Sequence, residues 1–135
     1  MYIYNEDVRY LLIFFVFSVV GWVIDTTYRS VAKARYAPGN RYPFSPVYGV
    51  GALVLSFFYA STPLSVYGSI LTAGILMVFV EFAAGLASEL VLGRRLWDYS
   101  KNPLNFMGHV DLLHACFWLL LAALYYWLGG FFPLY

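Results

Sequence analysis

The stretch YPFSPVYGVGALVLSFFYASTPLSVYGSILTAGILMVFV, residues 42–80, runs for 39 positions without one charged side chain. A single helix of that length would overshoot a bilayer, whose hydrocarbon core takes roughly 20 helical residues. Ser61-Thr62-Pro63 lies inside the stretch, and its proline interrupts a helix. We therefore predict two membrane-spanning helices here, roughly Pro46–Ala60 and Leu64–Leu92.

Two further apolar segments flank this stretch. A charge-free run from Tyr10 to Ile24 predicts a first span over Val8–Tyr28, and another apolar run predicts a last span from about His109 to Leu128. The whole chain is 62% hydrophobic and only 11% charged, whereas an ordinary soluble domain is about a quarter charged. We predict an all-α, polytopic membrane protein with four transmembrane helices in one bundle domain, residues 1–135.

Basic residues are distributed unevenly between the two predicted faces. With four spans, the first and third loops share one face, and the termini share the other face with the second loop. Arg9 is the only basic residue on the terminal face, and the loop face carries Arg29, Lys33, Arg35, Arg41, Arg94, Arg95 and Lys101. By the positive-inside rule both termini lie outside and the basic loops are cytoplasmic, as in a bacterial-type plasma membrane.

Several function classes are excluded or disfavoured. A formal net charge of +1 offers no field for nucleic acid, and the lone Cys116 allows no intramolecular disulfide. No Walker motif is present, so the chain does not hydrolyse ATP by that route. No nucleophile-elbow or kinase-like motif appears, and enzyme activity is not favoured. No HxxxH, HExxH or paired-cysteine motif supports a metal, and no cofactor is expected.

Glu81 is the leading candidate for a functional residue. Counted from Leu64 at 1.5 Å per residue, it lies roughly 25 Å into a hydrocarbon core about 30 Å thick. Such a carboxylate normally faces a bundle interior or a wet cavity, and is a candidate proton, cation or acid–base site. The structural alternative is an ion pair with Arg41 or Arg94 that holds two helices in register.

Other ionisable residues gather at the same cytoplasmic end. Glu89 follows Glu81 on the same predicted helix, and an interfacial carboxylate there would pair with basic loop residues. Asp25 and Arg29 are four residues apart and can pair on one helix face. Asp111 and His114 share a face three residues apart, where satisfied side chains at a helix entrance are favoured over a metal or proton site.

The loops and the third span resemble the ABC-transporter type IV, or CmpB-like, family of small integral membrane proteins. The matching residues are Gly21-Trp22 with Asp25, Asn40-Arg41, Pro46-Val47-Tyr48-Gly49-Val50-Gly51-Ala52, Glu81-x3-Gly85-x3-Glu89, Trp97-Asp98-Tyr99-Ser100, Pro103, Asn105, Gly108 and Trp118. The chain departs from the pattern at Asp25, where Glu is usual, and at Tyr42, where Gly usually follows the arginine. Asp111 and His114 replace less polar residues, so they are secondary candidates.

The resemblance implies a small membrane protein and one cytoplasmic-side group of polar residues. Its members are Asp25, Arg41, Glu81, Glu89, Trp97, Asp98, Tyr99 and Asn105. The polar loop that carries the tryptophan and tyrosine would fold back over the inner mouth of the bundle, or anchor at the interface.

These features favour a permease-like transporter or channel component in which Glu81 is a proton- or cation-coupling site. One alternative is an intramembrane enzyme that acts on a lipid or amphiphile at the cytoplasmic leaflet. Another is an accessory subunit of a larger membrane complex. The expected partners are the lipid bilayer, further copies of the chain in a homo-oligomer, and an unidentified partner subunit; the catalytic residues of any enzyme are unknown.

Overall fold

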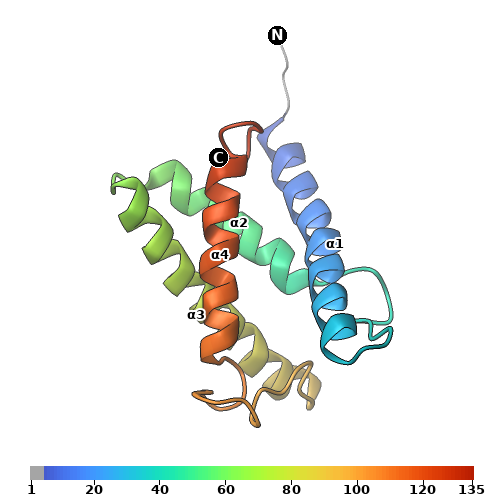
Figure 1. The fold of residues 1–135 in the computed structure, drawn as a ribbon. Coiled ribbons are helices and arrows are strands. Elements are labelled where there is room, and N and C mark those ends of the chain that lie inside the picture. Colours follow the sequence, from blue (N-terminus) through green and yellow to red (C-terminus); the bar gives the residue numbers. More distant parts are fainter. Residues whose placement is uncertain (1–4) are drawn as a thin grey trace. The chain divides into compact units, whose positions relative to one another are not determined.

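The computed structural model describes residues 5–135, which form four α-helices and no strand. The helices are α1 (Glu6–Ala32), α2 (Pro46–Ser61), α3 (Val66–Leu92) and α4 (Leu112–Leu128), labelled in Figure 1. An isolated antiparallel bridge between Phe106 and Val110 is the only extended pairing in the described chain. The predicted all-α class and the predicted break after α2 are confirmed.

The helix ends follow local capping chemistry. Ser65 caps α3 by accepting a hydrogen bond from the backbone N–H of Gly68, so the helix starts just after the predicted Leu64. Gly93 ends it in the left-handed conformation, with φ of 65°. The sequence predicts that the last helix starts near His109; Asp111 is its N-cap, so α4 begins three residues later, at Leu112, and ends at the predicted Leu128.

The chain divides into two compact units, with the boundary inside α2 after Val54. In the first unit the α1–α2 loop (residues 33–45) runs back along α1 (Figure 1). Hydrogen bonds tie it there: the backbone N–H of Gly39 donates to the Thr26 hydroxyl at 3.1 Å, and that of Ser45 donates to the Ser18 carbonyl at 2.9 Å. Polar groups on α1 thus hold the returning chain.

In the second unit, Leu55–Tyr135, α3 packs against α4. The two backbones approach closely at Gly74, where an added Cβ would lie 3.0 Å from the Cα of Leu119. The buried side of α3 consists of Ser69, Ala73, Gly74, Met77, Glu81, Gly85 and Ser88, spaced three or four residues apart. Small residues therefore let α4 approach, and the same face buries Glu81.

Tyrosine hydroxyls join the remaining segments of this unit. The Tyr59 hydroxyl donates to the Ala122 carbonyl at 2.9 Å, and the Ser56 and Tyr125 hydroxyls lie 2.6 Å apart. The chain end turns back on α4, where the Tyr135 hydroxyl donates to the Tyr126 carbonyl at 2.8 Å. Each of these hydroxyl groups thereby has a hydrogen-bond partner beside apolar side chains.

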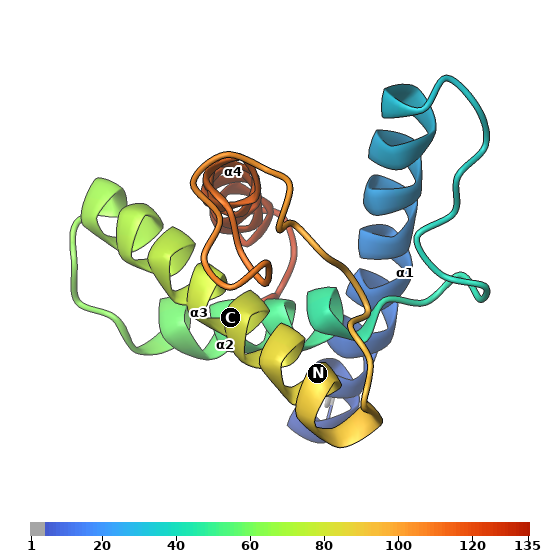
Figure 2. The ribbon, with the colours of Figure 1, turned by 90° about the horizontal axis from the view of Figure 1, so that it is seen from below.

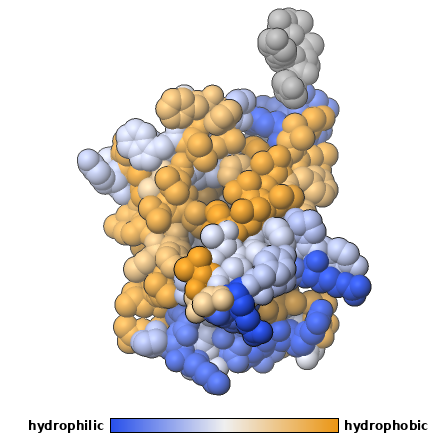
Figure 3. Space-filling model, turned by 45° about the vertical axis from the view of Figure 1, so that its right-hand side comes forward, coloured by the Kyte–Doolittle hydropathy of each residue, from blue (hydrophilic) through white to orange (hydrophobic). Residues whose placement is uncertain are grey.

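The helices expose far more apolar surface than a soluble protein tolerates. On α1 alone the exposed large hydrophobic residues include Leu11, Phe15, Val19 and Val23. Hydrophobic residues likewise cover much of the face drawn in Figure 3. By length and apolarity α1 and α3 can each cross a membrane, whereas α2 and α4 are shorter apolar helices.

Candidate functional site

Glu81 is held on the buried face of α3 and is only 5% exposed. Its Oε1 accepts a hydrogen bond from the Tyr99 hydroxyl at 3.0 Å. Tyr99 belongs to the α3–α4 loop (residues 93–111), which runs from the end of α3 back to the start of α4 (Figure 2). The loop therefore folds back onto α3, the helix that it follows.

The Tyr99 ring connects Glu81 to the start of α4. It stacks on the His114 ring, with centroids 4.0 Å apart and planes 10° from parallel. His114 Nδ1 in turn lies 2.7 Å from Asp111 Oδ1, which also accepts a hydrogen bond from the His114 backbone N–H at 2.7 Å. Asp111 and His114 are thus satisfied at a helix entrance, as the sequence favoured.

Asp111 is buried and has hydrogen bonds on both carboxylate oxygens. The Asn102 side-chain amide donates to Oδ2, and His114 contacts Oδ1. Burial by itself raises the pKa of Asp111, but the hydrogen bonds from Asn102 and His114 outweigh it and lower the pKa below its ordinary value of 3.8. The carboxylate is therefore ionised at neutral pH.

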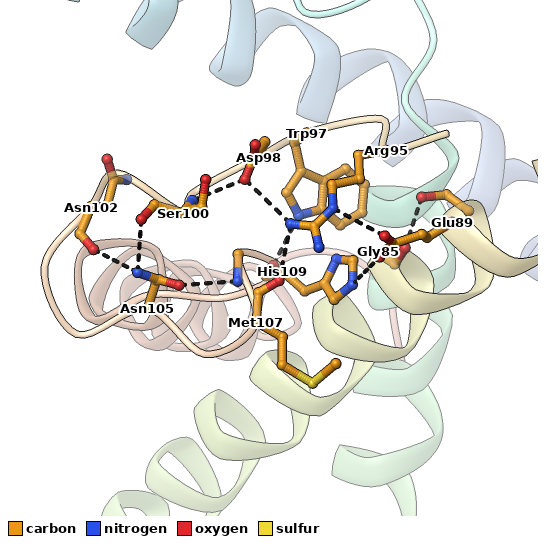
Figure 4. Close-up of polar contacts among 12 residues, drawn as sticks. Gly85, Glu89, Arg95, Trp97, Asp98, Ser100, Asn102, Asn105, Met107 and His109 are labelled. Atoms are coloured by element: carbon orange, nitrogen blue, oxygen red, sulfur yellow. Dashed lines mark hydrogen bonds and ion pairs between the residues drawn. The ribbon is translucent and has the colours of Figure 1, made fainter. Parts of the chain in front are cut away.

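A second polar group, seen in Figure 4, joins the last turns of α3 to the loop through Glu89. Its Oε2 lies 2.9 Å from His109 Nε2, and its Oε1 lies 3.3 Å from Arg95 Nε. Arg95 also lies 3.3 Å from Asp98 through Nη1. The predicted pairing of Glu89 with basic loop residues is confirmed.

Asp98 is exposed and shapes the loop. The backbone N–H of Ser100 donates to its Oδ1 at 2.9 Å. This hydrogen bond, followed by the side chain of Ser100 and by Arg95, lowers the pKa of Asp98. The Asp98 carboxylate therefore accepts the hydrogen bond that stabilises this turn, and it is exposed to solvent.

Trp97 and Asn105 also fix the loop. The Trp97 indole N–H donates to the His109 carbonyl at 2.9 Å. The Asn105 amide donates to the Ser100 and Asn102 carbonyls, and its oxygen accepts from the Gly108 N–H at 3.0 Å. Both candidates thus hold the backbone that presents Tyr99 and His109.

His109 is a residue of this group that sequence reasoning missed as a candidate. It is 0% exposed and packs against α3 where Gly85 has no side chain. A Cβ on Gly85 would lie 2.7 Å from His109 Nδ1. The signal available was the Gly85-x3-Glu89 spacing, which places a gap and a carboxylate on one helix face.

The other candidates lie in the first unit. Asp25 pairs with Arg29, whose Nε lies 2.8 Å from Oδ2, so the predicted i,i+4 pair is confirmed. Arg41 is exposed on the α1–α2 loop, with its guanidinium carbon 5.7 Å from the centroid of the Tyr42 ring. The second unit brings together Glu81 with Tyr99, and Glu89 with Arg95 and Asp98.

The contacts between the α3–α4 loop and α3 depend on the ionisation of two carboxylates. Its α3–α4 loop is attached to α3 through two carboxylates, Glu81 and Glu89, and each accepts contacts from loop side chains. A hydroxyl or arginine donates more strongly to an ionised carboxylate than to a protonated one. Within residues 5–135 no three His, Cys, Asp or Glu side chains are grouped so that they could hold a metal ion.

The comparisons with known proteins give one match. No curated protein and no solved structure is significantly similar to the chain. The model of the family described as "Putative ABC-transporter type IV", also labelled CmpB, matches residues 12–132 and so covers nearly the whole chain. With the two long apolar helices, this transporter-related family supports a membrane location. The chain belongs to the ABC-transporter type IV (CmpB) family of transporter-related membrane proteins.

Proposed function

We propose that the protein is a permease-like transporter or channel component with a proton- or cation-coupling site at Glu81. The observation that carries this proposal is the buried Glu81 carboxylate on an apolar helix, bonded to a hydroxyl of the α3–α4 loop. Ionisable groups within spanning helices are costly and face functional paths or partners. A carboxylate in this position can bind a proton or a cation within the membrane.

The contact with Tyr99 suggests how ion binding and loop position are linked. The Tyr99 hydroxyl donates to Glu81 Oε1. A proton or a bound cation neutralises the carboxylate and weakens this hydrogen bond. The loop and the ion therefore compete for Glu81, so that occupancy of the site loosens the loop.

The proposal includes four spans, with both termini outside and the loops at residues 33–45 and 93–111 in the cytoplasm of a bacterial-type cell. Seven of the eight basic residues fall on that face in this topology. Four short spans enclose little interior, so we propose a homo-oligomer. The chain has no Walker motif, so we propose that a partner subunit would supply any step driven by a Walker-type ATPase.

Proton and cation flux through proteoliposomes tests the proposal. Liposomes that contain wild-type protein and a dye sensitive to H⁺, K⁺ or Na⁺ are given a gradient of that ion, and its internal concentration is followed. We expect a flux that the Glu81→Gln variant loses while it still inserts and keeps its helix content. The matched control is Asp7→Asn, which neutralises an exposed carboxylate in the first turn of α1.

Three outcomes would contradict coupling at Glu81. Equal flux through wild type and Glu81→Gln would exclude the side chain from the coupling step. An absence of flux in both, together with a lipid that is chemically altered by wild type only, would replace transport by an intramembrane enzyme. Failure of Glu81→Gln to insert, with normal insertion of Tyr99→Phe, would make Glu81 a structural residue.

A further inference from the structure

The α1–α2 loop runs from the C-terminal end of α1 back towards its N-terminal end before α2 begins (Figures 1 and 2). The Trp22 indole N–H donates to the Asn40 carbonyl at 3.2 Å, and the Ser45 N–H donates to the Ser18 carbonyl at 2.9 Å. Ser18 lies about 21 Å along the helix axis from the end of α1 at Ala32, at 1.5 Å per residue. The loop thus follows half of the helix without helical structure of its own.

If α1 spans the membrane, the positions of Ser18 and Trp22, where the loop contacts α1, lie inside the hydrocarbon core. Glu6, Asp7 and Arg9 keep the first turn of α1 in the headgroup region, so the hydrocarbon core begins near Tyr10. A core about 30 Å thick then extends to about Arg29. Trp22 lies about 10 Å inside that boundary on the same scale.

The backbone of the returning segment is incompletely paired. Within residues 5–135 the backbone N–H groups of Asn40, Arg41 and Tyr42 donate no hydrogen bond. Lipid offers no acceptor for such groups, so non-helical backbone at membrane depth occurs only against protein or water. The segment therefore does not face hydrocarbon.

The side chains favour water as the neighbour. Arg41 is exposed and Tyr42 is 69% exposed, and the Asp25–Arg29 pair remains partly exposed beside the segment. A guanidinium group that is not paired with a carboxylate is far more stable in water than in an apolar contact. Gly39 packs so closely on Asp25 that an added Cβ would collide with Oδ2, which fixes the segment against this charged pair.

We propose that residues 39–45 form a re-entrant segment that lines a water-filled inlet, open at the basic end of α1, for small hydrated solutes or ions. The inlet deepens the proposed transport function by giving its cargo a polar entry on the cytoplasmic side, and it rests on the orientation proposed above. Its defining property is water at a depth where the other faces of α1 contact lipid.

Thiol accessibility tests this inlet. Single cysteines are placed in the full-length Cys116→Ser protein in membrane vesicles and treated with a membrane-impermeant methanethiosulfonate from the cytoplasmic side. Tyr42→Cys reports on the inlet, and Lys33→Cys is the positive control at the helix end. Val19→Cys and Val23→Cys are controls matched in depth, because both residues are exposed on α1 itself.

We expect Tyr42→Cys to react nearly as fast as Lys33→Cys, and about 100-fold faster than both valine positions, because only hydrated thiolate reacts. An unreactive Tyr42→Cys would overturn the inlet. So would equally fast valine positions, which would place this part of α1 outside the bilayer. Reaction only from the opposite side of the membrane would overturn the proposed orientation instead. The labelling rates do not depend on Glu81, so failure of the coupling proposal in the flux experiment would leave them unchanged.

Discussion

Asp111 combines three tasks in one buried side chain: it caps α4, contacts His114 and accepts a hydrogen bond from Asn102. Its pKa is lowered in the folded protein, below the ordinary 3.8, because these hydrogen bonds outweigh burial. A carboxyl group with a lowered folded-state pKa stabilises the fold above its unfolded-state pKa. That contribution is lost as the pH falls through the folded-state value.

The Asp111→Asn variant isolates this contribution, since asparagine remains a good N-cap. We expect the variant to unfold at a lower temperature than wild type at neutral pH, and the difference to shrink as the pH falls to about 3. Melting of the detergent-solubilised proteins, followed by circular dichroism, measures it. A difference that stays constant over this range would show that the ionised carboxylate adds nothing beyond the cap.

Local residue contacts could be predicted from the sequence, whereas contacts across the loop could not. The Asp25–Arg29 pair follows from their spacing on one helix, and the Asp111–His114 contact follows from a similar spacing. The contact of Glu89 with His109 joins an α3 residue to the far end of a loop, and its geometry depends on how that loop folds. The Gly85-x3-Glu89 spacing marks a gap beside a carboxylate on α3, but no periodic pattern specifies which residue fills it.

At the scale of elements, the packing of the α3–α4 loop against α3 depends on the missing side chain of Gly85. An added Cβ would lie 2.7 Å from His109 Nδ1 and 3.1 Å from its Cβ and Cγ. The imidazole has little room to move, because Nε2 contacts Glu89 and the His109 carbonyl accepts from Trp97. Overpacking here costs about 1–3 kcal/mol, more than the roughly 1 kcal/mol that alanine gains over glycine in a helix.

We therefore expect Gly85→Ala to lower the stability of the protein, measured as the midpoint of denaturation in detergent. The matched control is Gly68→Ala in the same helix, where the nearest atom is the Ser65 hydroxyl oxygen at 3.2 Å and the change should be small. Adding His109→Ala should restore part of the loss by removing the colliding ring. A Gly85→Ala protein as stable as the control would show that the loop does not depend on this contact.

The helices themselves could be predicted closely from apolar runs and proline positions, but their ends required capping chemistry. The predicted third span differs from α3 by two residues at its start, because Ser65 rather than Leu64 sets the boundary. The last helix starts three residues later than predicted, because residues 106–110 form a turn closed by the Phe106–Val110 bridge and Asp111 then caps the helix. The fold of the loop between them is set by side-chain bonds from Asn105 and Trp97, which leave no signature in hydropathy.

At the scale of the whole molecule, the number of spans depends on α2 and α4. Their 16 and 17 residues correspond to about 24–26 Å, slightly less than a typical hydrocarbon core. The chain following α4 offers an apolar, aromatic extension that turns back onto the helix at Tyr135, which suits an interface position. Because Ser45 is bonded to Ser18 within the proposed span of α1, α2 has only the rest of the core to cross, and modest local thinning of the bilayer would let α4 cross.

Four spans place Lys101 on the face opposite to both Thr62 and Phe131, whereas two spans, α1 and α3, leave Lys101 and Phe131 on the same face. Single cysteines at these three positions in the Cys116→Ser protein distinguish the two topologies by labelling with an impermeant reagent from each side of the membrane. We expect Lys101→Cys to react only from the cytoplasmic side, and Thr62→Cys and Phe131→Cys only from outside. Labelling of positions 101 and 131 from one common side would mean that α4 does not cross, and the basic loops would then need another explanation than the positive-inside rule.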